Sequence, residues 1–338
     1  MNKTILITIL LVFLVLVLFV TNLFCGAVSL EATQVMDALL GKTNDVTSYI
    51  VVGTRLPQAF TALLCGAALA VSGLLLQTTF SNPLADPSIL GVNAGASLGV
   101  AIAMLLFGGS VGLGSFSLSG FALTLFSAFI GAIAVIGLLL FFSTLLRSSL
   151  MLLIIGIIVG YLTSSIISLL NFSATAQGLQ SYVIWGMGNF SGVSTNQMPA
   201  FALVVIVGLV LSLLLVKPLN ALLLGENYAA NLGVNTRRVR TLILLVTGLL
   251  TAVTTAFCGP ISFIGLAVPH IIRLLLRTSN HRVLMPLTLL MGSCVALLCN
   301  ILCTLPTDGV LPLSVVTPLI GVPVVLYVML FRRGSGIN

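Results

Sequence analysis

The chain has 338 residues, of which 59% are hydrophobic and 6% are charged, whereas a typical soluble protein has about 25% charged residues. About 199 apolar residues (0.59 × 338) would fill roughly eight to ten membrane helices of about 20 residues each. This composition excludes a soluble enzyme, a nucleic-acid-binding protein and a disulfide-stabilised scaffold. The net charge of +7 can be interpreted only after the basic residues are placed along the chain.

Ten apolar stretches lie between polar or Gly/Pro-containing segments, and each predicts a membrane-spanning helix. They cover residues 4–24, 51–78, 88–107, 121–142, 150–171, 199–216, 241–258, 261–276, 284–304 and 311–331. The first resembles a signal peptide, but its apolar core is too long and no small-residue cleavage site follows, so we expect a retained membrane helix. The sequence therefore predicts an all-α, polytopic membrane protein with a single transmembrane domain over residues 1–338.

The basic residues test this arrangement, because short cytoplasmic loops keep Lys and Arg whereas translocated loops do not. With the N-terminus inside and ten crossings, 11 basic residues fall inside and 2, Lys42 and Arg55, fall outside. Two acidic residues fall inside and four outside, which gives +9 (11 − 2) inside and −2 (2 − 4) outside. Both termini are therefore predicted to be cytoplasmic in a multi-pass protein of the cell (inner) membrane, and the charge requires no nucleic acid or other anionic partner.

Three segments outside the spans have a recognisable character. Residues 29–41 place Val35, Met36, Leu39 and Leu40 at helical spacing, which predicts a short helix on the outer surface. Residues 177–197 contain the only tryptophan, Trp185, among Gly and Ser, and we interpret them as a broken helix and turn on the outer side. Residues 217–240 form the one long polar loop, on the inner side, and predict two small helices at an angle.

Two interrupted segments occupy matching places in the two halves of the chain. SNPLADPSILG (Ser81 to Gly91) follows the second span, and CGPISFIGLAVPH (Cys258 to His270) follows the seventh. Five spans per half force the second half to run inverted relative to the first. Broken helices at matching positions of inverted halves are typical of transporters, although two ordinary proline kinks would give the same pattern.

Glycine spacing predicts close helix packing rather than chemistry. Gly91, Gly95 and Gly99 form a double small-xxx-small ladder, and Gly156 and Gly160 repeat the spacing once. Such a ladder lets a second helix backbone approach closely.

Side chains that could perform chemistry are scarce. The six cysteines lie in or beside apolar runs without a C-x-x-C pair, so we interpret them as core residues. His270 and His281 lie near arginines with no cysteine or carboxylate at ligand spacing, which favours structural hydrogen bonding over a metal site. No nucleophile and base can be paired and no nucleotide-binding loop is recognisable, so an enzyme is not expected.

The positions of the acidic residues bear on the source of energy. Ion-coupled carriers keep titratable groups inside the helix bundle, whereas all six acids here lie at or outside the predicted helix ends. A pump with this sequence would take its energy from another polypeptide. The alternatives are an ion-coupled secondary carrier of a small molecule, which needs an intramembrane titratable residue, and a purely structural membrane scaffold, which needs no paired broken helices.

Three blocks of sequence resemble the FecCD-type permeases, the membrane subunits of ABC importers for iron-siderophores, haem and cobalamin. The blocks are RLPQAFTALLCGAALAVSGLLLQTTFSNPLADPSILGVNAGASLG (55–99), GENYAANLG (225–233), and FIGLAVPHIIRLL with NHRVLMP (263–286). The resemblance covers nearly the whole chain in order. It implies a ten-helix subunit that works as a homodimer, with two ATP-binding cassette subunits that hold ATP and Mg and an outer solute-binding protein that delivers a metal chelate. This chain itself would need no cofactor.

The resemblance also implies roles for individual residues, which fall into four groups. The helix that couples to the ATPase would contain Gly225, Glu226, Ala229, Leu232 and Gly233. The cytoplasmic gate would be formed by Asn82, Leu84 and Ser148 or Ser149. The outer entrance for cargo would be bordered by Trp185, Gly186 and Gly188. Arg55 would meet acidic groups on the binding protein.

One position departs from the family pattern. Relatives often read R-L-P-R, whereas this chain has Gln58 at the second basic position. Because the predicted outer face is also net negative, docking through several Arg–carboxylate pairs is not expected. A more apolar or differently placed contact would take its place.

Overall fold

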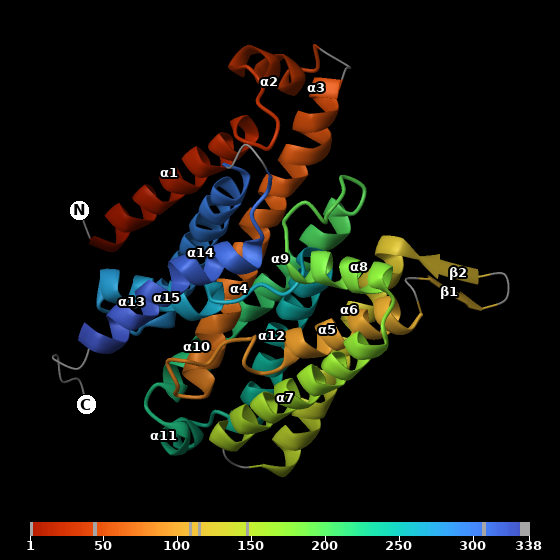
Figure 1. Cartoon of the computed structure of the whole chain (residues 1–338). Helices are drawn as coiled ribbons and strands as arrows, with labels where there is room; N and C mark the ends of the chain where they lie inside the picture. Colours follow the sequence, from red (N-terminus) through yellow and green to blue (C-terminus); the bar gives the residue numbers. More distant parts are fainter. Residues whose placement is uncertain are drawn as a thin grey trace. The chain divides into compact units, whose positions relative to one another are not determined.

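The structure is a computed structural model that describes residues 3–42, 46–107, 110–113, 116–146, 149–305 and 309–331. Within these ranges the regular secondary structure is helical apart from one short hairpin, and turns and irregular linkers join the elements (Figure 1). The elements are α1 (Lys3–Phe24), α2 (Ala32–Leu39), α3 (Val46–Ser48), the π-helical η1 (Tyr49–Arg55), α4 (Leu56–Thr79), α5 (Val92–Ala101), the π-helical η2 (Ile102–Leu106), β1 (Ser110–Leu113), β2 (Phe116–Ser119), α6 (Gly120–Leu145), α7 (Ser149–Ser173), α8 (Ala176–Gly186), α9 (Met198–Leu214), α10 (Val216–Leu222), α11 (Glu226–Asn231), α12 (Thr236–Cys258), α13 (Ile264–Leu276), α14 (His281–Thr304) and α15 (Leu313–Phe331).

Each of the ten predicted spans has a helical counterpart in the described residues. Six helices are long and apolar enough to cross a membrane: α1, the continuous α3–η1–α4, α6, α7, α12 and α14. The pair α9 and α10 passes the same test together, with a 50° bend between its members. The remaining three, α5 with η2, α13 and α15, are shorter apolar helices. The predicted all-α, polytopic fold is confirmed.

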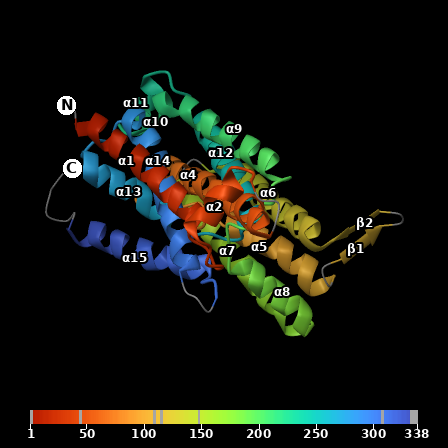
Figure 2. The same ribbon diagram turned by 90° about the horizontal axis from the view of Figure 1, so that it is seen from above.

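The segments between the spans are more ordered than the sequence indicated. The hairpin of β1 and β2 pairs Ser110 with Ser119 and extends away from the N-terminal end of α6 (Figures 1 and 2). This hairpin was not predicted. The predicted outer-surface helix is α2, which buries Val35 and Ala38 rather than Met36 and Leu40. In residues 217–240, α10 and α11 precede the start of α12, so the second predicted small helix is the first turn of a long one.

The helices form two compact units that do not coincide with the two halves of the sequence. The first unit comprises Met1–Leu74, Asn189–Val207 and Ser262–Asn338, and the second comprises Leu75–Gly188 and Gly208–Ile261. Most of α4, the second span of the first half, therefore packs with α13 and α14 of the second half. Conversely, α12, the second span of the second half, packs with α5 and α6 of the first half. The second span of each half of the sequence thus packs with helices of the other half.

In the first unit, α4 meets α13 and α14 at glycines. Gly66 faces the backbone of Gly292, and Gly73 faces the backbone of Gly265, so closely that a Cβ at either position of α4 would overlap the opposite chain. Such contacts allow helix backbones to approach and are common in membrane bundles. Figure 1 shows α1 lying along α14 in this unit.

A chain of side-chain amides links α1, α14 and α4 in the same unit. Asn300 Nδ2 donates to Asn22 Oδ1 at 2.7 Å, and Gln58 Nε2 donates to Asn300 Oδ1 at 2.9 Å. Asn22 Nδ2 also donates to the carbonyls of Leu18 and Leu297. Because Asn22 and Asn300 are buried, these bonds satisfy amide groups that would otherwise be costly to bury.

In the second unit, α5 packs against α6, α7 and α12. The predicted glycine ladder makes these contacts: Gly95 and Gly99 of α5 face Gly131 and Ser127 of α6 at backbone distance. Gly91, the N-cap of α5, lies against Gly156 of α7. The prediction of close packing is confirmed for Gly91, Gly95, Gly99 and Gly156, whereas a Cβ on Gly160 would meet nothing within 4 Å.

The third span of each half begins in the same unusual way. Gly91 caps α5 with φ +78°, and Phe263 caps α13 with φ +69°. Each cap lies against a glycine of the fifth span of its own half, Gly156 for Gly91 and Gly321 for Phe263. The two halves therefore share one packing design.

Five of the six cysteines and both histidines lie in the core of their units. Cys65, Cys258, Cys294, Cys299 and Cys303 are buried, Cys25 is half-buried, and all six are free thiols. This confirms the interpretation as core residues for the five buried cysteines, whereas Cys25 is only partly covered. His270 and His281 are also buried.

Candidate functional site

The predicted coupling helix is α11, a short helix with glycines at both ends. Gly225 precedes it with φ +101°, and Gly233 follows its C-cap, Leu232, with φ +82°. The amide of Gly233 donates to the carbonyl of Ala230 at 2.9 Å, and the amide of Val234 donates to that of Ala229 at 3.0 Å. This pair of bonds is a Schellman motif, which needs a left-handed residue where Gly233 stands. The sequence therefore fixes both ends of α11.

The surface of α11 is almost entirely exposed. Among its residues only Ala229 is buried. Apolar side chains nevertheless face outward in and beside the helix: Leu223, Leu224, Tyr228 and Leu232 are all exposed. A helix that contributes one buried residue to its own chain and exposes apolar side chains is suited to contact with another protein.

Glu226 of α11 points back to its own chain. Its Oε1 accepts a 2.7 Å hydrogen bond from Nη2 of Arg240, in the first turns of α12. The Arg240 side chain is 7% exposed and that of Glu226 is 45% exposed. Arg240 Nη1 also donates to the carbonyl of Leu146 at 3.4 Å, and Arg237 Nη2 donates to the carbonyl of Thr144 at 2.7 Å. α11 is thus linked to the C-terminal end of α6.

The first linker, residues 80–91, contains the predicted gate residues Asn82 and Leu84. It begins with a second Schellman motif, in which the amides of Ser81 and Asn82 donate to the carbonyls of Thr78 and Gln77. Here Ser81 takes the left-handed conformation with φ +47°. Asn82 Oδ1 then accepts from the amide of Leu84 at 2.9 Å. The result is a tight turn that leaves the Leu84 side chain 37% exposed.

Asp86 lies in the same linker and is buried. Its Oδ1 accepts a long, 3.5 Å hydrogen bond from the amide of Ser88. Burial raises the pKa of Asp86 to about 6, and the hydrogen bonds from Ser88 only partly oppose this effect. The linker therefore holds a carboxyl group that titrates close to physiological pH.

The other gate residues were predicted at the start of the fifth span. Ser149 is the first residue of α7, as expected, whereas Ser148 lies outside the described residues. Gly156, in the same helix, contacts Gly91 at the end of the first linker. Both segments that carry predicted gate residues are therefore joined by a backbone contact.

The predicted entrance residues lie at the end of α8 and directly after it. The rings of Trp185 and Tyr182 are 6.5 Å apart, and burial raises the pKa of Tyr182. Gly188 adopts φ +68°, and its amide donates to the carbonyl of Trp185. A Cβ on Gly259, which caps α12, would lie 2.6 Å from the Trp185 carbonyl oxygen and 2.9 Å from the Gly188 Cα. The entrance segment is thus packed against the end of α12.

Arg55, predicted to meet the binding protein, is turned inward. It is 4% exposed, and its guanidinium donates to the carbonyls of Leu23, Phe24 and Val28. These carbonyls include the last of α1, so the charge stabilises the negative end of that helix and the turn after it. The Gln58 side chain likewise bonds within its own chain, because its Nε2 donates to Asn300 Oδ1.

Sequence reasoning missed three residues that this geometry makes prominent. Arg240 was counted only as a cytoplasmic charge, although a basic residue placed soon after a helix N-terminus is unfavourable unless another group compensates it. Asp86 was counted in the same way, although an acid between two prolines of an apolar linker is exceptional. Gly259 was quoted as part of the second interrupted segment without a contact of its own.

Comparison with known proteins gives concordant results in sequence and structure. A model of the FecCD transport family matches residues 14–331. The vitamin B12 import system permease protein BtuC of Klebsiella pneumoniae subsp. pneumoniae is 38% identical over 283 residues, which are 83% of this chain and 82% of the relative. BtuC of Citrobacter koseri is 37% identical over 281 residues, 82% of each chain. A solved inward-facing structure of a metal-chelate-type ABC transporter superimposes with a TM-score of 0.81 at 33% identity, over 96% of this chain and 97% of the other.

Proposed function

Because the chain belongs to the FecCD transport family, we propose that it moves a metal chelate of the cobalamin, iron-siderophore or haem class into the cell. Its role is that of a permease subunit of an ABC importer. The relatives import vitamin B12, and the similar solved structure is of a metal-chelate type. These similarities favour a large metal complex as cargo, with cobalamin as the first compound to test.

The partners in this proposal are a second copy of the chain, two ATP-binding cassette subunits and an outer solute-binding protein. The observation that carries it is α11, whose fixed ends and exposed Leu224, Tyr228 and Leu232 suit insertion into a groove of another protein. On the proposed ten-span topology α11 follows six crossings, so it lies on the same side as the N-terminus. Cytoplasmic termini would then place it where the ATPase binds.

In the proposed mechanism, ATP and Mg are bound by the partner, and closure of the two ATPases moves the coupling helices of the two permeases. The helix bundles then rock so that one gate opens as the other closes. The inner gate is formed by Asn82, Leu84 and the 148–149 segment, and the outer entrance by Trp185, Gly186 and Gly188. Cargo recognition is left mainly to the solute-binding protein.

Purification with the native membrane complex tests the assembly. The full chain, tagged and extracted from its source membranes in mild detergent, is expected to carry an ATP-binding cassette subunit in a 1:1 ratio. The complex and its binding protein are then reconstituted, and ATP hydrolysis is measured with cyanocobalamin, ferrichrome and haem in turn. Stimulation by one of them identifies the chelate class.

The outcome opposed to this proposal is specific. Purified chain that carries no ATPase, and that takes up substrate in liposomes under a proton or sodium gradient alone, would instead be an ion-coupled secondary carrier. Such a carrier needs a titratable group within the bundle.

A further inference from the structure

We propose that Arg240 and Arg237 form a mechanical relay that carries the movement of α11 to the C-terminal end of α6, shortly before Ser149, the predicted gate residue that begins α7. This inference rests on the proposed coupling role of α11 and names the residues that would transmit it. Every contact involved lies within the second compact unit.

The first step of the relay is the attachment of α11 to α12. The helix buries only Ala229, so packing alone gives it a small hold on its own chain. The 2.7 Å bond between Glu226 Oε1 and Arg240 Nη2 adds a charge-assisted contact. Arg240 is buried at one end of this contact, which keeps its guanidinium in one place. A displacement of α11 is therefore passed to Arg240.

The second step joins α12 to α6. The last carbonyls of a helix have no partner within it and carry a partial negative charge. Arg240 and Arg237 donate to two of these at the end of α6, those of Leu146 and Thr144. The arginines are unfavourably placed near the positive end of α12, and this contact with the negative end of α6 offsets that cost. The two helix ends are thereby held together.

The third step follows from chain order. Leu146 is the last described residue before α7, which begins at Ser149. Leu146 is three peptide bonds from Ser149 in the chain, so a shift of the Leu146 backbone is expected to reach this predicted gate residue. The path from Glu226 to the gate consists of one ion pair, one buried guanidinium and one backbone carbonyl.

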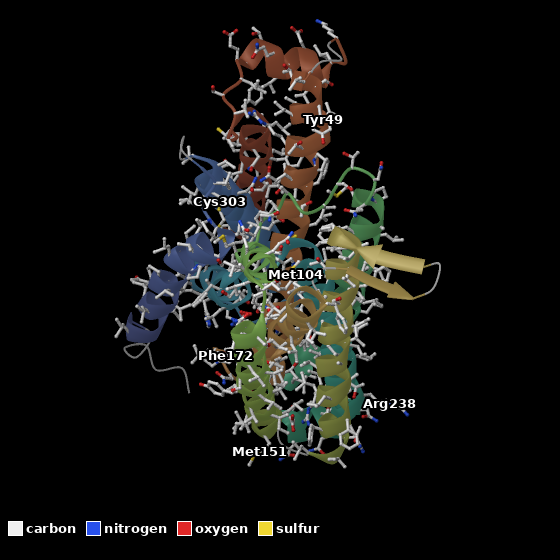
Figure 3. All side chains as sticks on the ribbon, turned by 45° about the vertical axis from the view of Figure 1, so that its right-hand side comes forward. Tyr49, Met104, Met151, Phe172, Arg238 and Cys303 are labelled. Atoms are coloured by element: carbon white, nitrogen blue, oxygen red, sulfur yellow. The ribbon has the colours of Figure 1, made fainter. Side chains whose placement is uncertain are left out.

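The sequence offers a matched control for charge. Arg238 lies between the two relay arginines, is exposed, and makes no side-chain contact among the residues that the structure describes. Figure 3 shows its side chain extending away from α12. Arg238→Gln removes the same charge from the same helix turn without touching the relay.

The test measures gate movement in the complete complex, independently of cargo. Cys25→Ser removes the one thiol that is not buried, and Ser149→Cys then reports the gate through its reaction rate with a water-soluble maleimide, with and without ATP and vanadate. ATP hydrolysis is measured on the same samples. In this background, Arg240→Gln and Glu226→Gln are each expected to reduce the ATP-dependent change in labelling about tenfold, within the range of coupling between sites. ATP hydrolysis should stay within about twofold of the parent, and Arg238→Gln should behave as the parent in both assays.

Double substitution separates a relay from two independent effects. If Glu226 acts through Arg240, the combined Glu226→Gln and Arg240→Gln variant should be no worse than Arg240→Gln alone, because residues of one path are not additive. Arg240→Lys keeps the charge but has one nitrogen in place of Nη1 and Nη2, so it cannot reproduce the spacing of the two bonds to Glu226 and Leu146, and it is expected to behave like Arg240→Gln.

The outcomes that contradict the relay are distinct from those that contradict the proposed function. A parent complex without ATP-dependent labelling at Ser149→Cys overturns the coupling role of α11, and the relay with it. A parent that responds, together with Arg240→Gln and Glu226→Gln variants that respond equally, overturns the relay alone. If Arg240→Gln does not assemble, Glu226→Gln decides, because it changes only a half-exposed side chain and keeps the Arg240 guanidinium on the Leu146 carbonyl.

Discussion

Gly91 and Gly156 bring the first linker and α7 into backbone contact. A Cβ on Gly91 would lie 2.9 Å from the carbonyl oxygen of Gly156, and a Cβ on Gly156 would lie 2.8 Å from the Cα of Leu90. Phe263 and Gly321 repeat the arrangement in the second half, with 2.6 Å between the Phe263 Cβ and a Cβ built on Gly321. The close approach of the first linker to α7, the two segments that carry the proposed gate residues, thus depends on glycines.

Alanine at position 156 is expected to destabilise the protein. The atoms that a new methyl group would meet are backbone, which cannot rotate away, and overpacking of this kind costs about 1–3 kcal/mol. Gly160→Ala, one turn further along α7, is the control, because a Cβ there meets nothing within 4 Å and alanine favours the helix by about 0.5–1 kcal/mol. Thermal unfolding in detergent should give a lower midpoint for Gly156→Ala and an equal or higher one for Gly160→Ala. Equal midpoints for both variants would contradict tight packing of the first linker against Gly156.

Arg55 is expected to contribute to stability. Replacing it by Gln removes a buried guanidinium that serves three carbonyls, and hydrogen bonds to charged groups contribute about 1.5–3 kcal/mol each. Arg55→Gln should therefore lower the thermal midpoint clearly, and Arg55→Lys should recover only part of the loss. Affinity for the solute-binding protein, measured on folded complex, addresses the docking role separately. A variant with normal stability and weakened binding would instead support a docking role for Arg55 and contradict its role in stability.

The conformation of Gly233 supplies a sharp test of the coupling helix. Nothing lies within 4 Å of a Cβ built there, so the effect of a substitution comes from the positive φ alone. Gly233→Val should distort the end of α11 and reduce the amount of ATPase that co-purifies, because a β-branched residue is strongly disfavoured in this conformation. Gly233→Asn is the matched variant, since Asn tolerates the left-handed region, and it should retain the ATPase. Equal retention by both variants would separate ATPase binding from the geometry of this turn.

Asp86 makes stability depend on pH in a predictable direction. Its pKa rises on folding from 3.8 to about 6, so the folded state binds more protons than the unfolded state between these values. Stability should therefore fall as pH rises from about 4 to about 6 and remain lower above that, by about 3 kcal/mol if the whole shift is realised.

Asp86→Asn should abolish this dependence and raise the thermal midpoint at pH 7.5, because Asn keeps an oxygen for the Ser88 amide without the charge. Asp37→Asn is the control for a general charge effect, because the Asp37 side chain is 47% exposed and its partner, Lys42, is 65% exposed. A parent protein whose thermal midpoint does not change between pH 4 and 7 would contradict the burial of the Asp86 carboxyl group.

Hydrophobic patterning was sufficient to find the ten spans, because a membrane helix must hide its backbone bonds and expose apolar side chains along its own length. The glycine ladder from Gly91 to Gly99 was predictable for a similar reason, since close packing requires small residues at fixed spacing. The two ends of α11 could also be predicted from nearby sequence, because Gly225 and Gly233 mark them.

What could not be predicted depends on residues distant in sequence. The carbonyls that receive Arg55 belong to α1 and the turn after it, and the partner of Gln58 is 242 residues away. Nothing in the R-L-P-Q motif itself tells whether its polar groups face a neighbouring helix or another protein. The β1–β2 hairpin was missed because its strands have only four residues each, so the alternation of apolar residues with Ser or Gly in SVGL and FSLS is too short to identify a strand.

The amides of Asn22 and Asn300 lie 278 residues apart in sequence, and this separation has a consequence for biogenesis. The helix that carries Asn22 enters the membrane well before its hydrogen-bonding partner, which is synthesised 278 residues later. During that interval the amide has to be accommodated by the insertion machinery, by water or by a temporary neighbour. The first compact unit can therefore reach its native structure only after α14 has been synthesised, and a truncated chain lacking α14 would leave α1 as a target for membrane quality control.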